Sequence, residues 1–231
     1  VYQSFHDALA GLSTLCENAA RTAESAQAAS TSERGRELSE MARICRRIAH
    51  HPPASFREAL QLAWLAILGC HFADRAWLVS PGRLDRILWP YYEAGIASGE
   101  LTASQAFTLI ECLYLLINEN VPDGLAVAVM VGGRDTAGAD VTNPLSYLCL
   151  AAVRRIRMNR AAVLLATTAL PLAEVARSVG YPNPQSMARA FRAMHGLTPA
   201  AVRRSGRPCP EVPAPLKGVL PMFPVEIRQM P

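Results

Sequence analysis

The sequence predicts a mainly α-helical protein with two parts of opposite charge. Apolar residues recur at helical spacing along most of the chain, and hydrophobic residues make up 51% of its 231 residues, enough for a core. Residues 1–150 carry 11 Arg against 16 Asp and Glu, whereas residues 151–231 carry 12 Lys and Arg against 3 Glu. This asymmetry favours a nucleic-acid partner for the second part; the alternative is a generic solvated surface.

The first two helices are expected within residues 1–50. Residues 1–30 are rich in Ala and Ser and place one apolar side on a surface helix or two, namely Leu9, Leu12, Cys16 and Ala19. A further helix is predicted to begin at Ser32 as its N-cap and to end at the His-His-Pro-Pro run of residues 50–53, because proline disfavours helix in the preceding residue. Three glutamates of this helix, Glu33, Glu37 and Glu40, precede Arg43, Arg46 and Arg47, which suits the helix dipole.

Two buried helices are expected next. Ser55 and Glu58 have the spacing of a capping box, and residues 59–72 are apolar nearly all round. A turn at residues 79–85 leads into another helix, and Thr102 caps a long apolar helix over residues 105–118. The predicted core consists of Leu60, Trp64, Leu65, Leu68, Leu109, Leu113 and Leu116.

Residues 125–131 form a short β-like run before Gly132 and Gly133. No parallel partner for this run is identifiable in the sequence, and a lone strand is not stable. The run must therefore pair with another chain, bend into a loop, or leave the fold marginal, and these alternatives stay open.

Several segments of residues 35–152 resemble, in order, the N-terminal part of glycyl radical enzymes of the pyruvate formate-lyase-like family. The segments are PASFREALQ at 53–61, SPGRLD at 80–85, LWPYY at 88–92, and GG at 132–133 through TNPLSYL at 142–148. The resemblance implies a helical layer that, in the full enzyme, packs against a ten-stranded α/β barrel. From this resemblance we expect the domain to be truncated.

The catalytic residues of that family are not found. The family stores a radical on a glycine and relays it through an upstream cysteine in a Cys-x-Glu setting. Residues 177–181 (RSVGY) imitate the glycine loop and residues 209–211 (CPE) imitate the cysteine site. However, Gly180 is explained as a turn glycine, and Cys209 follows the glycine instead of preceding it. We therefore expect no catalytic residue and no cofactor.

Residues 172–203 have the pattern of a helix-turn-helix. Gly180 suits a helix C-terminus, Asn183 suits an N-cap, and Pro184 suits a first helical position. Each helix has one apolar face: Leu172, Val175, Ala176 and Val179 in the first, and Met187, Ala190, Phe191 and Met194 in the second. The outer face of the second helix is basic, with no acid.

Residues 157–204 resemble the C-terminal helix-turn-helix of AraC-type regulators. The resemblance lies in Arg160-Ala161-Ala162, Leu164-Leu165, Thr168, Val175-Ala176, Val179-Gly180-Tyr181, Arg189, Phe191, Gly196, Thr198-Pro199 and Arg203. It departs from the pattern at Met187. It implies DNA base contacts in the major groove from Gln185, Ser186 and Arg189, and phosphate contacts from Arg192, Arg203 and Arg204. The family's DNA-binding domain has two such motifs, of which only the second is present.

The expected organisation is a lyase-like segment over residues 1–152, a helix-turn-helix over 153–204 and a proline-rich tail over 205–231, with one continuous helix across residues 150–160. Six cysteines and five histidines show no metal-like spacing, and no secretory signal or apolar run long enough for a membrane span is recognised, so a cytoplasmic location is expected.

The favoured function is sequence-specific DNA binding in transcriptional regulation, with DNA as partner and a homodimer through residues 1–150 as a further expectation. The alternatives are a truncated glycyl radical enzyme, such as a formate acetyltransferase-like or glycerol or choline lyase-like fragment, and a non-functional fusion.

Overall fold

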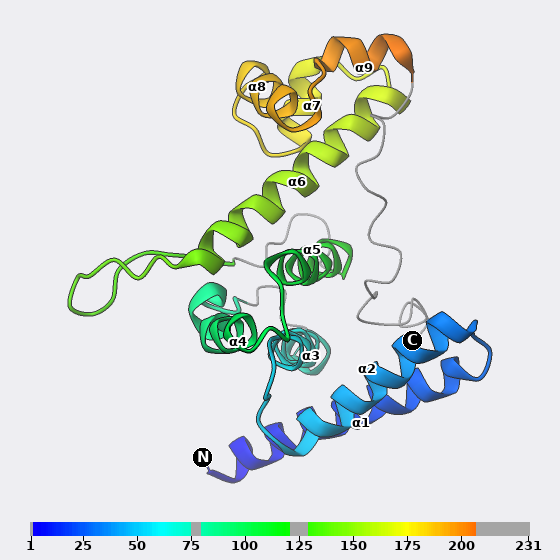
Figure 1. Ribbon diagram of the computed structural model, residues 1–231, viewed down its shortest axis with the longest axis vertical. Helices are drawn as coiled ribbons and strands as arrows, with labels where there is room; N and C mark the ends of the chain where they lie inside the picture. The colour runs from blue at the N-terminus through cyan, green and yellow to red at the C-terminus, as the bar shows by residue number, and fades with distance from the viewer. Residues whose placement is uncertain (1, 75–79, 121–128, 207–231) are drawn as a thin grey trace. The chain divides into compact units, whose positions relative to one another are not determined.

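The computed structural model describes residues 2–74, 80–120 and 129–206, and in these residues it contains nine helices and no strand (Figure 1). The expected mainly α-helical class is thus confirmed. The chain divides into two compact units, unit 1 up to Cys149 and unit 2 from Leu150. Helix α6, Pro144–Thr167, runs through this division without a break, as the lack of Gly and Pro there predicts. No described helix has both the length and the apolarity of a membrane span.

Helices α1, Tyr2–Gln27, and α2, Ser32–His50, pack side by side as an antiparallel pair (Figure 1). Cys16 of α1 and Cys45 of α2 are fully buried at their contact. Leu9, which shares its side of the helix with Cys16 in the sequence pattern, is 65% exposed. Antiparallel pairing of Cys16 with Cys45 carries Leu9 beyond the His50 end of α2.

The N-cap of α2 is Thr31, and the expectation of Ser32 is wrong by one residue. The Thr31 hydroxyl accepts a hydrogen bond from the Arg34 backbone N–H at 3.4 Å, so Ser32 becomes the first helical residue. The C-terminal end agrees with the prediction, since His51 adopts extended backbone directly before Pro52.

Helices α3, Phe56–Asp74, α4, Leu84–Ser98, and α5, Ala103–Asn120, complete unit 1. The Glu58 backbone N–H donates to the Ser55 hydroxyl at 3.2 Å. Thr102 and Gln105 form a reciprocal capping box, because the Gln105 N–H donates to the Thr102 hydroxyl and the Thr102 N–H donates to Gln105 Oε1. Six of the seven predicted core residues are buried, whereas Leu116 is only half-buried. Ile117 is buried instead, because it continues the inner face of α5 through Leu113.

The part of the β-like run at residues 125–128 lies outside the described residues. Met130, in the described part, forms an isolated parallel bridge with Arg83. The Met130 N–H donates to the Gly82 carbonyl at 3.2 Å and the Leu84 N–H donates to the Met130 carbonyl at 3.1 Å. The expectation that the run has no identifiable parallel partner is therefore wrong at Met130. Its partner, Arg83, lies in residues 79–85, which the sequence pattern predicts only as a turn.

Asp85, at the start of α4, holds the loop after this bridge in place. Its carboxylate is almost fully buried and accepts hydrogen bonds from the Gly132 N–H, at 2.6 Å, and from the Ser146 hydroxyl. Arg83 donates to the Gly132 carbonyl at 2.6 Å. The SPGRLD and GG segments, far apart in the sequence, thus form one structural feature of unit 1.

Candidate nucleic-acid interface

Unit 2 contains the three short helices α7, Leu172–Ser178, α8, Pro184–His195, and α9, Pro199–Ser205, which pack with the C-terminal half of α6 around one core (Figure 1). The largest members of this core are Met158, Leu165, Met187 and Phe191, each at most 2% exposed. Met187, where the sequence departs from the AraC-type pattern, is fully buried, so the departure is a change in core packing.

The turn between α7 and α8 is a Schellman motif. Gly180 has φ +76°, the Tyr181 N–H donates to the Ala176 carbonyl at 2.8 Å, and the Gly180 N–H donates to the Arg177 carbonyl at 3.0 Å. A residue with a Cβ would be strained at this φ. The role of Gly180 as a turn glycine is thus borne out by the geometry.

Helix α8 begins as the sequence predicts. Asn183 is its N-cap and accepts a hydrogen bond from the Ser186 N–H at 2.8 Å, and Pro184 occupies the first helical position. Burial of Met187 and Phe191 turns the opposite face outward, where Gln185 and Arg189 are exposed. Two of the three predicted base-contacting side chains therefore lie together on one exposed face.

The other predicted contact residues differ in their surroundings. Ser186 is half-buried, and Arg192 and Arg204 are exposed. Arg203 is half-buried, and its guanidinium donates a hydrogen bond to the Leu170 carbonyl, in the segment before α7. Its Nε is buried and has no hydrogen-bond partner within the part of the chain that the structure describes. Arg203 therefore ties α9 to the start of the helix-turn-helix.

One residue near the turn was not singled out by the sequence. The guanidinium of Arg157, on α6, lies so close to Gly180 that a Cβ placed on the glycine would be 3.3 Å from Arg157 Cζ. The Arg-Arg-Ile-Arg run of residues 154–157 marked only the joint between the two parts. Periodicity alone does not show which neighbour an arginine reaches across a fold.

Unit 2 carries a large excess of positive charge. Its described residues include nine arginines and a single acid, Glu174. Such an excess of positive charge on a small domain is typical of a surface that contacts a polyanion.

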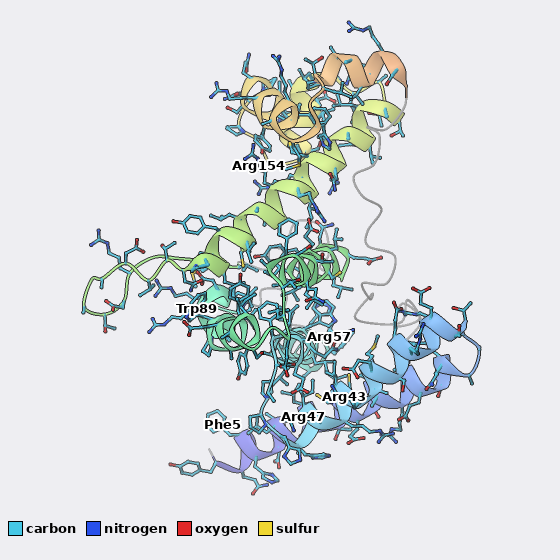
Figure 2. All side chains as sticks on the ribbon, in the orientation of Figure 1. Phe5, Arg43, Arg47, Arg57, Trp89 and Arg154 are labelled. Carbon is cyan, nitrogen blue, oxygen red and sulfur yellow. The ribbon has the colours of Figure 1, made fainter. Side chains whose placement is uncertain are left out.

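Unit 1 contains a separate pocket of about 560 Å³ between α3, α4 and α5. Its lining includes Arg57, Tyr91, Glu100, Leu101, Gln105 and Leu109. Burial lowers the pKa of Arg57 below its ordinary value, although Glu40 and Glu37 act in the opposite direction. These two glutamates already bind Arg43 and Arg34, and Arg57, labelled in Figure 2, makes no hydrogen bond to any described residue.

The described residues contain no group of three or more His, Cys, Asp or Glu side chains placed to hold a metal ion. The cysteines are mostly buried; Cys16, Cys45 and Cys149 are fully enclosed, whereas Cys70 is exposed. Cys209 lies outside the described residues.

Comparison with known proteins confirms both resemblances. A family model described as pyruvate formate lyase-like matches residues 1–165, and one described as a helix-turn-helix domain matches residues 147–205. An isethionate sulfite-lyase of Nitratidesulfovibrio vulgaris is 34% identical over 140 residues, which cover 54% of this chain and 17% of that enzyme. The glycyl radical subunit of a 4-hydroxyphenylacetate decarboxylase of Clostridioides difficile is 30% identical over 169 residues, covering 68% of this chain and 19% of the subunit.

Solved structures of glycyl radical enzymes share the fold of much of this chain. A glycyl radical enzyme from Archaeoglobus fulgidus superposes with a TM-score of 0.55 at 28% identity, covering 64% of this chain and 21% of the enzyme. A glycerol dehydratase from Clostridium butyricum gives a TM-score of 0.57 at 25% identity, covering 83% and 27%. The chain thus spans about a fifth to a quarter of the length of these relatives.

Proposed function

The chain belongs to the pyruvate formate lyase-like family, and from this membership together with its helix-turn-helix we propose that it is a DNA-binding transcriptional regulator with a non-catalytic lyase-like part. The observation that carries the proposal is the exposed face of α8. A buried apolar face and a capped N-terminus leave Gln185 and Arg189 free to enter a major groove. A cytoplasmic location follows from the same proposal.

Each side chain of the interface has a chemically distinct role in this proposal. Gln185 suits the N6 and N7 atoms of adenine, and Arg189 suits the O6 and N7 atoms of guanine through its bidentate fork. Ser186 lies beside them on α8. Arg192 and Arg204 are exposed cations suited to phosphates, which give affinity without sequence information. Arg203 donates one N–H group to the Leu170 carbonyl and its Nε is buried, so the proposed phosphate contact uses the other N–H groups at the end of the guanidinium.

For unit 1 we propose a sensing role in a homodimer formed through residues 1–150. The pocket supports the sensing role, because its volume falls in the range of small-molecule sites and its lining combines the half-buried Arg57 with apolar side chains and with polar ones that include Glu100. Two relatives are named for isethionate and 4-hydroxyphenylacetate, which are both organic anions. An organic anion bound by Arg57 is therefore the proposed effector.

The competing function is that of a truncated lyase that contributes to radical chemistry. The match of residues 1–165 to the lyase-like family is the observation that supports this alternative. It requires a radical glycine, and the glycine in the imitating RSVGY segment is Gly180, which occupies the Schellman turn. A third alternative is a fusion without function, which predicts neither duplex binding nor ligand binding.

The proposed function is tested by selecting preferred duplexes from a random pool with the full chain and by titrating the selected and random duplexes. A preference for the selected duplex that depends on Arg189 supports the proposal. Absence of duplex binding at low salt contradicts it.

A further inference from the structure

Arg157 lies over the turn that precedes the proposed reading helix. A Cβ on Gly180 would be 3.3 Å from Arg157 Cζ and 3.4 Å from one of its terminal nitrogens. Gly180 is followed closely by Asn183, the N-cap of α8. Because Arg157 is nevertheless exposed, its positive charge is presented to solvent beside the segment that leads into α8.

The end of α7 does not need Arg157 as a cap. The backbone carbonyls of Val175, Ala176 and Arg177 already accept hydrogen bonds from the N–H groups of Val179, Tyr181 and Gly180. An arginine at a helix C-terminus often serves such carbonyls, but here the Schellman motif has satisfied them. The N–H groups of Arg157 thus have no partner among the residues that the structure describes, and they are open to a ligand.

Arg154 extends the same positive surface. It precedes Arg157 by three residues on α6, so the two side chains are neighbours along the helix, and it is also exposed (Figure 2). Neither arginine forms an ion pair or hydrogen bond with any residue that the structure describes in unit 2, where Glu174 is the single acid. Two adjacent guanidinium groups without an internal counter-charge repel each other until an anion binds.

We propose that Arg154 and Arg157 form a second DNA contact, here called the phosphate strip. The two arginines bind phosphates of the DNA backbone beside the major groove that α8 enters. The inference rests on the proposed function, because it takes DNA as the ligand, and it deepens it by assigning a role to α6. A single helix-turn-helix offers few contacts, and a strip on the connecting helix adds backbone affinity to the one motif of AraC-type domains that is identified in this chain.

The test uses the full chain with Arg154→Gln, Arg157→Gln and the double variant, each titrated with labelled selected and random duplexes over a series of salt concentrations. Each lost phosphate contact should lower the slope of log affinity against log salt by about 0.9 and weaken both duplexes by the same factor. Arg157→Lys should retain the slope, because a lysine still neutralises a phosphate. Arg36→Gln, an exposed arginine of α2, removes the same charge from unit 1 and should change nothing.

The outcomes separate the strip from the proposed reading of bases. An unchanged salt slope in the double variant, or a loss confined to the selected duplex, overturns the strip. If wild type binds both duplexes equally and the slope falls in the variants, the strip stands and base reading by α8 fails. Binding to heparin as tight as to duplex overturns the assignment to DNA. No binding by wild type overturns both. If Arg157→Gln lowers the melting temperature, its effect on binding also reflects a loss of stability. The salt slope of Arg154→Gln then tests the strip, because Arg154 is exposed.

Discussion

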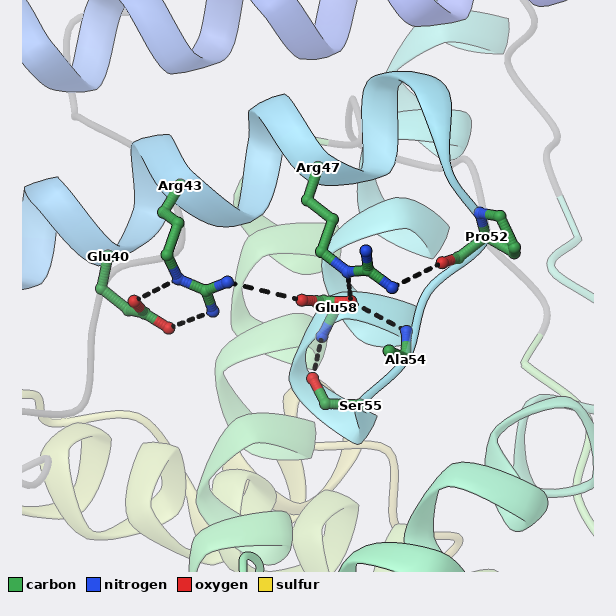
Figure 3. Close-up of polar contacts among 7 residues, drawn as sticks. All are labelled: Glu40, Arg43, Arg47, Pro52, Ala54, Ser55 and Glu58. Carbon is green, nitrogen blue, oxygen red and sulfur yellow. Dashed lines mark hydrogen bonds and ion pairs between the residues drawn. The ribbon is translucent and has the colours of Figure 1, made fainter.

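Arg47 of α2 donates a hydrogen bond from Nε to the carboxylate of Glu58 in α3, at 3.0 Å (Figure 3). The Glu58 side chain is only 4% exposed, and the same oxygen accepts a second hydrogen bond, from the Ala54 backbone N–H, at 2.8 Å. Arg43 approaches the other oxygen at 3.9 Å while it binds Glu40 with two hydrogen bonds of 2.8 Å. One buried carboxylate therefore joins α2, the Pro-Pro turn and the start of α3.

Replacing this carboxylate should destabilise unit 1. Glu58→Gln keeps the shape but leaves Arg47 and the Ala54 N–H without a charged acceptor, which should cost about 1–3 kcal/mol of the free energy of unfolding. The measurement is urea unfolding followed by circular dichroism. Glu40→Gln is the matched control, because its exposed pair with Arg43 should contribute less than about 1 kcal/mol. Equal losses for both variants would show that burial of Glu58 does not matter.

Thiol reactivity should follow burial. Burial raises the pKa of Cys16 and Cys149 to about 11 and that of Cys45 to about 12. Since the thiolate is the nucleophile, these three thiols stay protonated and unreactive at pH 8, whereas the exposed Cys70 should be alkylated by iodoacetamide. Mass spectrometry of a Cys209→Ser variant checks this, and the same reaction in denaturant should modify every remaining cysteine. Fast labelling of Cys45 in the native protein would contradict the packing of α1 on α2.

The pocket of unit 1 should distinguish an anion from its neutral analogue. Phenylacetate should bind and phenylacetamide should not, measured by calorimetry on the full chain. Arg57→Gln should weaken phenylacetate by about tenfold or more, because hydrogen bonds to charged groups contribute about 1.5–3 kcal/mol. Arg36→Gln again serves as control. Equal binding of the acid and the amide, or an unaffected Arg57→Gln, would exclude the arginine as the anion site.

Radical chemistry should be absent. Under anaerobic conditions with an activating enzyme and S-adenosylmethionine, the chain should show no organic radical in electron paramagnetic resonance. The physical reason is that Gly180 sits in a turn of the helix-turn-helix, and binding a substrate without a radical leaves the difficult step undone. A glycine-centred doublet would instead support the truncated-lyase alternative.

The spacing of neighbouring residues predicts the helices and the turn of the interface, whereas it does not predict contacts between segments that are distant in the chain. The turn glycine Gly180 and the cap Asn183 act on residues within one helical turn, so their spacing predicts them. Three features join segments that are distant in the chain: the close approach of Arg157 to Gly180, the hydrogen bond of Arg203 to Leu170, and the bridge of Met130 to Arg83. Such pairings depend on how helices pack, which helical periodicity leaves open.

Arg189→Ala and Arg204→Ala should separate the reading of bases from the holding of phosphates. Arg189 shares the exposed face of α8 with Gln185, so its loss should cost about 1–3 kcal/mol on the selected duplex and relax the preference at one base pair. Arg204 is exposed at the end of α9, and its loss should weaken all duplexes alike and lower the salt slope by about one. Arg203→Ala should in addition lower the melting temperature of unit 2, because it removes the hydrogen bond to Leu170. Titrations of the three variants against selected and random duplexes measure these differences. If Arg189→Ala weakens both duplexes by the same factor, α8 contacts only the backbone, and the specificity of the protein must be sought in the shape of the DNA.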